Sequence, residues 1–175
     1  VADLSPILTR VITVDDRLQP GEYERQRLAN VRPPQWRNPV PPRTPYDLVI
    51  IGAGPAGLVA AEAAVELDAR VAVVERDALG GNCLNFGCIP SKSLIRTARV
   101  FGDLRSAAQY GIRANDGGDV EFAAIMERMR RIRARISRVD SARRLSEAGV
   151  DVFFCEGAFA NPDSVEVAGA RLRFR

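Results

Sequence analysis

The chain has 175 residues, 46% of them hydrophobic and 27% charged, which is enough for one globular domain with a sizeable core. Its net charge of +3 is too small to favour nucleic acid as a partner, and no apolar run reaches the length that crosses a bilayer. With three cysteines, no histidine and no visible signal peptide, we expect a cytoplasmic protein rather than a secreted disulfide scaffold.

Residues 1–45 are predicted to form an extension that is separable from the domain after it. Six prolines lie within residues 32–45, and they exclude a regular helix or a central strand there. Trp36 is the one large apolar anchor of this stretch, so we expect a tail that is docked by Trp36, with partner binding as the alternative. Residues 7–14 favour a short strand or a helical turn.

A β-α-β unit of about thirty residues is predicted to follow the extension. Residues 46–52 are a short apolar run that ends in glycine, which is typical of a buried parallel strand. Residues 55–68 are rich in alanine and leucine and have a proline at the start, so they are predicted to form a helix. Residues 70–75 are predicted to form the second buried strand.

Two long helices and a group of strands are predicted for the rest of the chain. Residues 91–109 and 120–148 have helical patterns, and the second carries an apolar stripe among many arginines. The arginines indicate either a nucleic-acid footprint or a solvated helix face, and the glutamates and apolar stripe favour the solvated face. Residues 150–159 are predicted to form a strand, and residues 164–175 a hairpin that turns at residues 168–169.

A glycine-rich turn joins the first predicted strand to the first predicted helix. Gly52, Gly54 and Gly57 have the spacing G-x-G-x-x-G, and Glu75 ends the next predicted strand. In dinucleotide-binding turns, the first glycine permits the tight turn, the second lets the backbone approach a pyrophosphate, and the third lets helix and strand pack closely. The helix N-terminus offers N–H groups to phosphates, and an acid at position 75 can bind ribose hydroxyls. The pattern therefore predicts a dinucleotide site.

Cys83 and Cys88 lie five residues apart in the stretch "GGNCLNFGCIPSKSL", which also contains Lys92, the only lysine of the chain. Gly87 provides the backbone freedom that a disulfide between them needs, and Cys88 lies at a predicted helix start, where a thiol becomes more reactive. The pair favours a redox disulfide. A zinc site, which lacks enough ligands here, and two inert buried thiols are the alternatives. Cys155, in an apolar strand, is predicted to be a core residue.

The segment "GGNCLNFGCIPSK" resembles the active-site segment of the class I flavoprotein disulfide reductases. The order of "IGAGPAG", "VVE" and "GGNC" and the stretch "EGAFANPDSVEV" resemble this family too, so the resemblance covers roughly residues 46–175. It implies an α/β fold, with a three-layer, FAD-binding Rossmann-type domain that is incomplete at its C-terminus and carries a long helical pair. It also implies FAD as the cofactor and NAD(P)H as the electron donor of the parent enzyme.

The resemblance also implies roles for individual residues. Cys88 is expected to lie nearer the flavin, Cys83 to exchange with the substrate, and Lys92 to stabilise the reduced flavin beside its N5 atom. The residues expected to bind the cofactor are Gly52, Gly54, Pro55, Ala56, Gly57, Glu75, Gly81, Asn82, Lys92 and Gly157. The sequence departs from the family at Asp68, where glycine is usual, and at Asn82, where threonine is commoner.

The chain resembles only the N-terminal part of such an enzyme. Family members have a second Rossmann domain for NAD(P)H and a dimerisation domain, so these missing domains and a second copy are the expected partners, and nucleic acid and membrane are not. The leader with "VRPPQWRNP" resembles the mercuric-reductase-like branch, and dihydrolipoamide dehydrogenase is the runner-up. A catalytically inactive fragment that binds a nucleotide or a dimer partner is the alternative from a different class.

Overall fold

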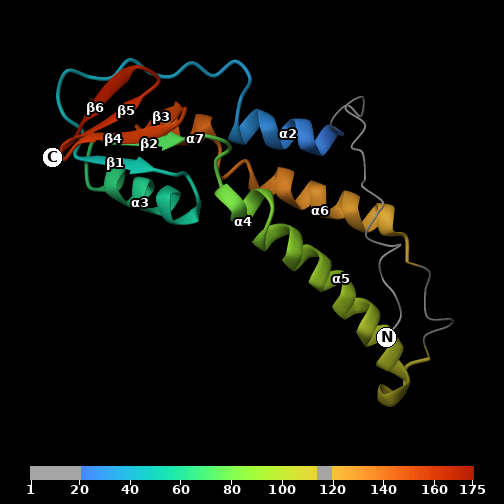
Figure 1. Cartoon of the computed structure of the whole chain (residues 1–175). Coiled ribbons are helices and arrows are strands. Elements are labelled where there is room, and N and C mark those ends of the chain that lie inside the picture. The colour runs from blue at the N-terminus through green and yellow to red at the C-terminus, as the bar shows by residue number, and fades with distance from the viewer. Residues whose placement is uncertain (1–20, 114–119) are drawn as a thin grey trace, which may run out of the picture.

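The computed structural model describes residues 21–113 and 120–175. The strand or helical turn predicted for residues 7–14 lies outside the described residues. The described chain consists of a layered α/β unit and an arm of long helices that extends away from it (Figure 1). Within the described parts, no helix is long and apolar enough to span a membrane.

A parallel sheet of three strands lies at the centre of the layered unit. The strands are β1 (Leu48–Ile51), β2 (Val71–Glu75) and β3 (Asp151–Phe154), in the order β1-β2-β3. The central strand β2 is buried along its whole length, which accounts for its nearly continuous apolar sequence. Helix α3 (Pro55–Glu66) connects β1 to β2, with proline at its first position, so the predicted β-α-β unit is present.

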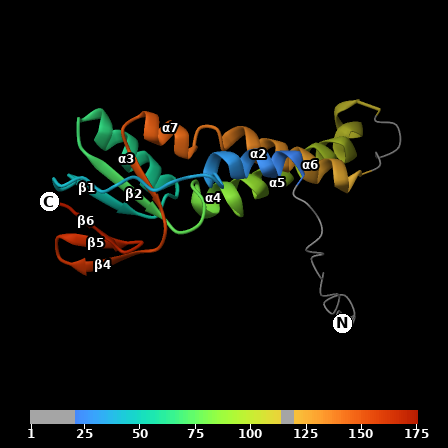
Figure 2. The same ribbon diagram turned by 90° about the horizontal axis from the view of Figure 1, so that it is seen from above.

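The layered unit has three layers. Helices α3 and α7 (Ala142–Glu147) cover one face of the parallel sheet, and an antiparallel sheet covers the other face (Figure 2). The antiparallel sheet contains β4 (Gly157–Asn161), β5 (Ser164–Val167) and β6 (Ala170–Arg173). This arrangement confirms the predicted α/β class with a three-layer, Rossmann-type domain.

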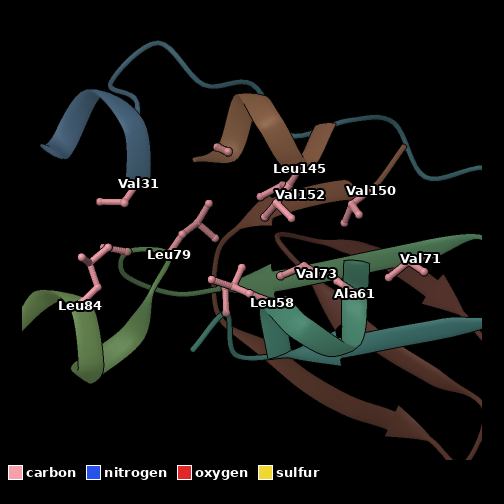
Figure 3. Close-up of a cluster of buried hydrophobic side chains, with 13 residues drawn as sticks. Val31, Leu58, Ala61, Val71, Val73, Leu79, Leu84, Leu145, Val150 and Val152 are labelled. Atoms are coloured by element: carbon pink, nitrogen blue, oxygen red, sulfur yellow. The ribbon is translucent and has the colours of Figure 1, made fainter. Parts of the chain in front are cut away.

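Two clusters of apolar side chains fill the spaces between these layers. The larger cluster lies between the helices and the parallel sheet, where Leu58, Val73, Leu145 and Val152 converge (Figure 3). The smaller cluster lies between the two sheets and includes Phe153. Successive side chains of a strand point to opposite faces, so neighbouring residues of β3 contribute to different clusters.

The C-terminal strands agree only in part with the sequence prediction. The hairpin turns at Ala168 (φ 47°) and Gly169 (φ 78°), as predicted. The single strand predicted for residues 150–159 is wrong, because β3 ends at Phe154 and β4 begins at Gly157. Between them the chain passes from the parallel to the antiparallel sheet. Because the sequence is apolar through both strands, the break between them could not be predicted from it.

Two long helices, α5 (Cys88–Ser106) and α6 (Phe122–Ile136), form the arm and lie alongside each other (Figures 1 and 2). The single helix predicted for residues 120–148 is wrong, because α6 and α7 are separate helices. The side chain of Ser141 accepts a hydrogen bond from the N–H of Arg144 at 3.2 Å, which caps the start of α7 and accounts for the break.

The far end of the arm exposes apolar side chains. A short 3-10 helix, η1 (Ala107–Tyr110), follows α5 directly. An open groove of about 600 Å³ lies between α5 and α6. It is lined by Leu94, Thr97, Ala98, Val100, Phe101, Leu104, Val120, Glu121, Phe122, Ala124 and Ile125.

Helix α2 (Glu22–Val31) was not predicted, because its sequence has no clear apolar stripe and is followed by many prolines. It packs beside α6 and joins the arm as its third helix (Figure 2). Its last residue, Val31, is fully buried in the larger apolar cluster (Figure 3). After it, the Trp36 Nε1–H donates to the carbonyl oxygen of Val152 at 3.0 Å, and the indole packs edge-on against Phe154. The expected docking of this segment by Trp36 is therefore present.

Candidate functional site

The glycine-rich turn between β1 and α3 requires glycine at two positions. Gly52 has a φ of +101°, which L-residues rarely adopt, and its N–H donates to the carbonyl oxygen of Val74 at 2.8 Å. A Cβ atom on Gly57 would lie 2.1 Å from the carbonyl oxygen of Gly52, so α3 reaches the strand end only with glycine there. The space in front of Gly54 is open, because a Cβ atom there would meet no atom within 4 Å. The turn therefore leaves room for a ligand at its second glycine.

The N-terminus of α3 lies beside this open space. The helix begins with Pro55, and no side chain caps it. The N–H groups of Ala56 and Gly57 belong to the first turn, where they have no partner within the helix. Together with the positive end of the helix dipole, they can receive the oxygen atoms of a phosphate.

Glu75 connects this turn to the end of β2. Its side chain is only 8% exposed. One carboxylate oxygen, Oε2, accepts a hydrogen bond from the N–H of Ala53 at 2.7 Å, and the other, Oε1, accepts one from the N–H of Asp77 at 2.8 Å. These two bonds fix the orientation of the carboxylate. Since a carboxylate can accept about four hydrogen bonds, capacity for a ligand hydroxyl remains.

Two cavities share Glu75 and Arg76 in their walls. The first has a volume of about 260 Å³ and is lined by Ile51, Gly52, Val74, Glu75, Arg76, Cys155, Glu156 and Gly157. The second has a volume of about 240 Å³ and is lined by Glu75, Arg76, Asp77, Ala78, Gly81, Asn82, Asn85 and Phe86. Arg76, Asn85 and Glu156 were not predicted from the sequence, although the position of Arg76 directly after Glu75 was an available signal.

Gly157 and Cys155 lie on the first cavity. A Cβ atom on Gly157 would lie 2.9 Å from Cγ1 of Val74, so glycine allows β4 to pass close to β2. Cys155 was predicted to be a core residue, and it does pack against the smaller apolar cluster. It is nevertheless only half-buried and forms part of the cavity wall, and its partial burial raises the pKa of its thiol.

The segment after β2 folds back onto the glycine-rich turn. Gly80 (φ +83°) and Gly81 (φ +52°) are both left-handed, and Gly81 begins the short helix α4 (Gly81–Asn85). A Cβ atom on Gly81 would lie 2.9 Å from the Cα atom of Gly54, so the two glycine segments are in direct contact. The contact brings Gly81 and Asn82 beside the open space of the dinucleotide turn.

Gly87 separates α4 from α5. Its φ of −114° and ψ of −97° lie outside the α and β regions that L-residues favour, which agrees with the backbone freedom predicted for this glycine. A Cβ atom there would lie 3.1 Å from the carbonyl oxygen of Asn82, and the Gly87 N–H donates to that same oxygen at 2.6 Å. Close approach to α4 also favours glycine at this position.

The thiols of Cys83 and Cys88 meet across this step between α4 and α5. Cys83 is half-buried on α4, and Cys88 is exposed as the first residue of α5. Both are free thiols in the structure. The hydrogen bond between them and the desolvation of Cys83 raise the pKa of Cys83, while the charge of Lys92, one turn further along α5, acts in the opposite direction.

The candidate site residues therefore fall into two neighbouring groups. Gly52, Gly54, Pro55, Ala56 and Gly57 form the dinucleotide turn, with Glu75 and Gly157 beside it. Gly81, Asn82, Cys83 and Cys88 form the redox turn, a name used below for residues 79–88, and Lys92 lies beyond it on α5. The contact between Gly54 and Gly81 joins the two groups.

The sequence signature of the pyridine nucleotide-disulphide oxidoreductases matches residues 46–174, which is most of the chain. The chain therefore belongs to this family. The resemblance to flavoprotein disulfide reductases that was inferred from the cysteine segment is confirmed.

Individual relatives match the same part of the chain. A dihydrolipoyl dehydrogenase of Mycoplasma pneumoniae is 39% identical over 124 residues, which are 71% of this chain and 27% of that protein. A mercuric reductase of Lysinibacillus sphaericus is 32% identical over 127 residues, 73% of this chain and 23% of that protein. Both enzyme types expected from the sequence are thus among the relatives.

A solved structure shares the fold. It is the Cu(II) complex of the HOCl-induced flavoprotein disulfide reductase RclA from Escherichia coli, with a TM-score of 0.56 and 25% identity over 72% of this chain and 25% of that chain. The chain spans about a quarter of the length of these three relatives.

Proposed function

We propose that this chain provides the FAD-binding and disulfide part of an FAD-dependent NAD(P)H:disulfide or metal-ion oxidoreductase. The observation that carries the proposal is the contact between the redox turn and the dinucleotide turn: Gly81, two residues before Cys83, packs on Gly54 beside the open ligand space. Family membership supports the proposal. Because the chain spans about a quarter of its relatives, the activity is proposed for a protein that contains this chain together with further domains.

The residues present fit the ADP half of FAD. The first turn of α3 and the open space at Gly54 suit a pyrophosphate, and the fixed carboxylate of Glu75 suits ribose hydroxyls. Arg76 adds a positive charge on both cavities, and Gly157 lines the first cavity together with Gly52. When bound, the flavin supplies two-electron transfer between a nicotinamide and the cysteine pair.

The cysteine pair accepts those two electrons as a disulfide. Its S–S bond breaks as two electrons and two protons are taken up, which gives the two thiols seen in the structure. Cys88 is proposed as the thiol nearer the flavin and Cys83 as the thiol that attacks the substrate. The ammonium group of Lys92 favours negative charge at this place, which supports thiolate formation during exchange.

The electron acceptor is proposed to be either Hg(II) or a disulfide of the lipoamide type. The proline-rich leader supports the mercuric-reductase-like branch, whereas the dihydrolipoyl dehydrogenases among the relatives support a disulfide. Steady-state assays of the protein that contains this chain, with each acceptor in turn and with NADH or NADPH, would separate these alternatives.

Thiol titration and flavin binding test the proposed function directly. The air-oxidised chain should gain two reactive thiols on treatment with a reductant, and Cys83→Ser should abolish that gain. Added FAD should lose fluorescence on binding, and Gly54→Val should weaken this binding because its side chain fills the open space. An unchanged thiol count in Cys83→Ser would show that the pair is not bonded.

Turnover by the 175-residue chain alone is expected to be negligible. It contains no histidine, and a positioned general acid–base contributes roughly 10²–10⁴-fold in rate. The purified chain with FAD and NAD(P)H should therefore reduce Hg(II) or a disulfide no faster than free flavin does. Turnover above that background, abolished by Cys88→Ala, would show that the cysteine motif carries catalysis by itself.

A second copy of the protein is the partner proposed for the full-length enzyme, as family membership implies. The apolar groove between α5 and α6 offers a surface for it, because an exposed apolar patch of this kind is typical of an interface. Light scattering of the protein with Leu104→Glu should show more monomer than the wild type. An unchanged mass would argue against this surface.

A further inference from the structure

Helix α2 contacts the loop that leads from β2 to the redox turn. The Arg32 guanidinium donates through Nη1 to the carbonyl oxygens of Arg76 at 2.9 Å and Asp77 at 2.6 Å. The carbonyl oxygen of Val31 accepts a hydrogen bond from the N–H of Leu79 at 3.0 Å. The side chains of these two residues, Val31 and Leu79, also pack in the larger apolar cluster (Figure 3). The C-terminal end of α2 therefore holds the backbone that leads into the redox turn and the first residue of that turn.

A third contact reaches into the redox turn itself. Arg27 of α2 donates through Nη1 to the side-chain oxygen of Asn85, the last residue of α4. Both side chains are buried, with exposures of 6% and 3%. The other end of the Arg27 guanidinium donates to Glu24, at 3.2 Å from Nε, which holds it in place. A buried, doubly held arginine of this kind has one orientation available to it.

Asn85, whose side chain is oriented by Arg27, in turn holds the backbone near Cys83. Its Nδ2 group donates to the carbonyl oxygen of Leu79 at 3.1 Å and to that of Gly81 at 2.9 Å. The bond from Arg27 to Oδ1 fixes which end of the amide faces these carbonyls, because only the nitrogen end can donate to them. Without the amide, the left-handed residues Gly80 and Gly81 have wide conformational freedom.

We propose that Arg27 is a positioning residue for the redox pair, acting through Asn85 on the turn that carries Cys83. Helix α2, which precedes the residues that the family signature matches, is then a working part of the redox site. This inference rests on the proposed function of the cysteine pair, and it adds the element that sets the pair's geometry and reactivity.

The expected consequence concerns the distance between the two sulfur atoms. Cys83 is two residues from Gly81 and two from Asn85, so movement of either end of α4 moves its thiol relative to Cys88. Loss of the thiol–thiol hydrogen bond lets the pKa of Cys83 fall toward its ordinary value. The fraction of Cys83 that is present as thiolate then rises, while the two sulfur atoms come within bonding distance less often.

Two measurements on the full chain test the proposal. The first is the alkylation rate of Cys83 in the fully reduced protein, followed site by site with iodoacetamide and mass spectrometry. The second is the equilibrium with glutathione, in which the two cysteine thiols form an S–S bond as one glutathione disulfide becomes two glutathione thiols. Arg27→Met should raise the alkylation rate several-fold and lower the equilibrium constant on the order of tenfold, which is about 30 mV for a two-electron couple.

Arg133→Met is the matched control. Arg133, on α6, is also buried and pairs with the same carboxylate of Glu24, at 3.5 Å, but Asn85 bonds to Arg27 and not to Arg133. It should lower thermal stability as Arg27→Met does and leave both thiol measurements unchanged. Asn85→Asp keeps an acceptor for Arg27 but loses both donors to the turn, so it should reproduce the thiol effects of Arg27→Met.

Arg27→Lys keeps a cation beside Glu24 without the planar fork that reaches Asn85, and it replaces Arg27→Met if that variant does not fold. The proposal is overturned if the Arg27 variant changes Cys83 alkylation no more than Arg133→Met does. Alkylation needs only the reduced thiols, so this result stands whether or not the wild type forms a disulfide. A wild type that never forms one would instead refute the proposed function.

Discussion

The layered unit and the helical arm are stabilised by different interactions. In the layered unit, fully buried apolar side chains such as Val73 and Leu145 fill the spaces between layers, and glycines allow close backbone contacts. In the arm, Glu24 pairs with Arg27 of its own helix and with Arg133 of α6, while apolar residues such as Leu104 remain exposed.

This difference shows which contacts fix the conformation of the redox turn. On one side it is fixed by excluded volume, through the contact between Gly81 and Gly54. On the other side it is fixed by directional polar contacts, through Arg27 and Asn85. Packing contacts tolerate changes of pH and salt but not of volume, whereas buried ion pairs respond to the loss of one partner. Different substitutions and conditions should therefore destabilise the two regions.

The largest effect is expected for Gly57→Val in the layered unit. The new Cβ atom would lie 2.1 Å from the carbonyl oxygen of Gly52, a backbone atom that cannot move without breaking the turn. We expect the free energy of unfolding to fall by about 4 kcal/mol or more, the range reserved for severe mutations. Urea denaturation followed by circular dichroism measures this change.

Gly102→Ala in α5 is the matched control for that substitution. A Cβ atom on Gly102 would meet no atom within 4 Å, and the residue lies in the exposed interior of a helix. Alanine should therefore raise the free energy of unfolding by about 0.5–1 kcal/mol. Equal losses for the two variants would contradict the distinction between the layered unit and the arm.

A smaller loss is expected for Leu145→Ala in the larger apolar cluster. Leu145 is 1% exposed, and its truncation leaves a cavity that costs about 3 kcal/mol. Leu104→Ala on the arm removes the same atoms from a side chain that is 45% exposed, so its effect should stay within about 0.5 kcal/mol. Chemical denaturation of both variants under the same conditions gives the comparison, and similar midpoints would contradict it.

The layered unit was largely predictable from the sequence because its signals are local. The glycine spacing, the buried strands and the proline at the start of α3 each specify their own conformation within a few residues. The positions of Gly52, Gly57 and Glu75 in the structure follow from these patterns. The hairpin turn was predictable for the same reason, since Gly169 adopts a left-handed conformation.

The arm was less predictable because its contacts join distant parts of the chain. Helix α2 has no apolar stripe, and it is held by Val31 and Arg27, whose partners lie about fifty residues later. The break between α6 and α7 depends on a capping serine, Ser141, inside an otherwise helical pattern. Asn85 was missed because a buried amide that organises a turn has no sequence signature of its own.

Limited proteolysis probes the proposed boundary between residues 45 and 46. Trypsin should cut first after Arg37 and Arg43, which are exposed, and not after Arg32, which precedes a proline. The piece that contains α2 should nevertheless remain bound to the layered unit, because Val31 and Arg27 still hold it. Co-elution of the two pieces on size-exclusion chromatography checks this, and separation would mean that the leader is an independent tail.

The smallest effect is expected for the pH dependence of stability, which should have opposite signs at two carboxyl groups. The hydrogen bond from Arg27 lowers the pKa of Glu24 below 4.5, although burial partly offsets it. Its contribution to stability is therefore present above about pH 4.5 and is lost as the pH falls through its folded-state pKa. Burial raises the pKa of Asp140, between α6 and α7, above 3.8, so its contribution is present at low pH and is lost as the pH rises.

Glu24→Gln and Asp140→Asn separate these two contributions. At pH 7, Glu24→Gln should lower the free energy of unfolding by less than about 1 kcal/mol, and Asp140→Asn should leave it unchanged or raise it slightly. Both differences should shrink as the pH falls from 7 to 3, because the carboxyl groups of the wild type take up protons on the way. Thermal unfolding between pH 3 and pH 7 measures them. If Glu24→Gln stayed as stable as the wild type at every pH, the ion pair of the arm would contribute nothing, and apolar packing together with the hydrogen bonds of Arg27 and Arg32 would hold α2 against the redox turn.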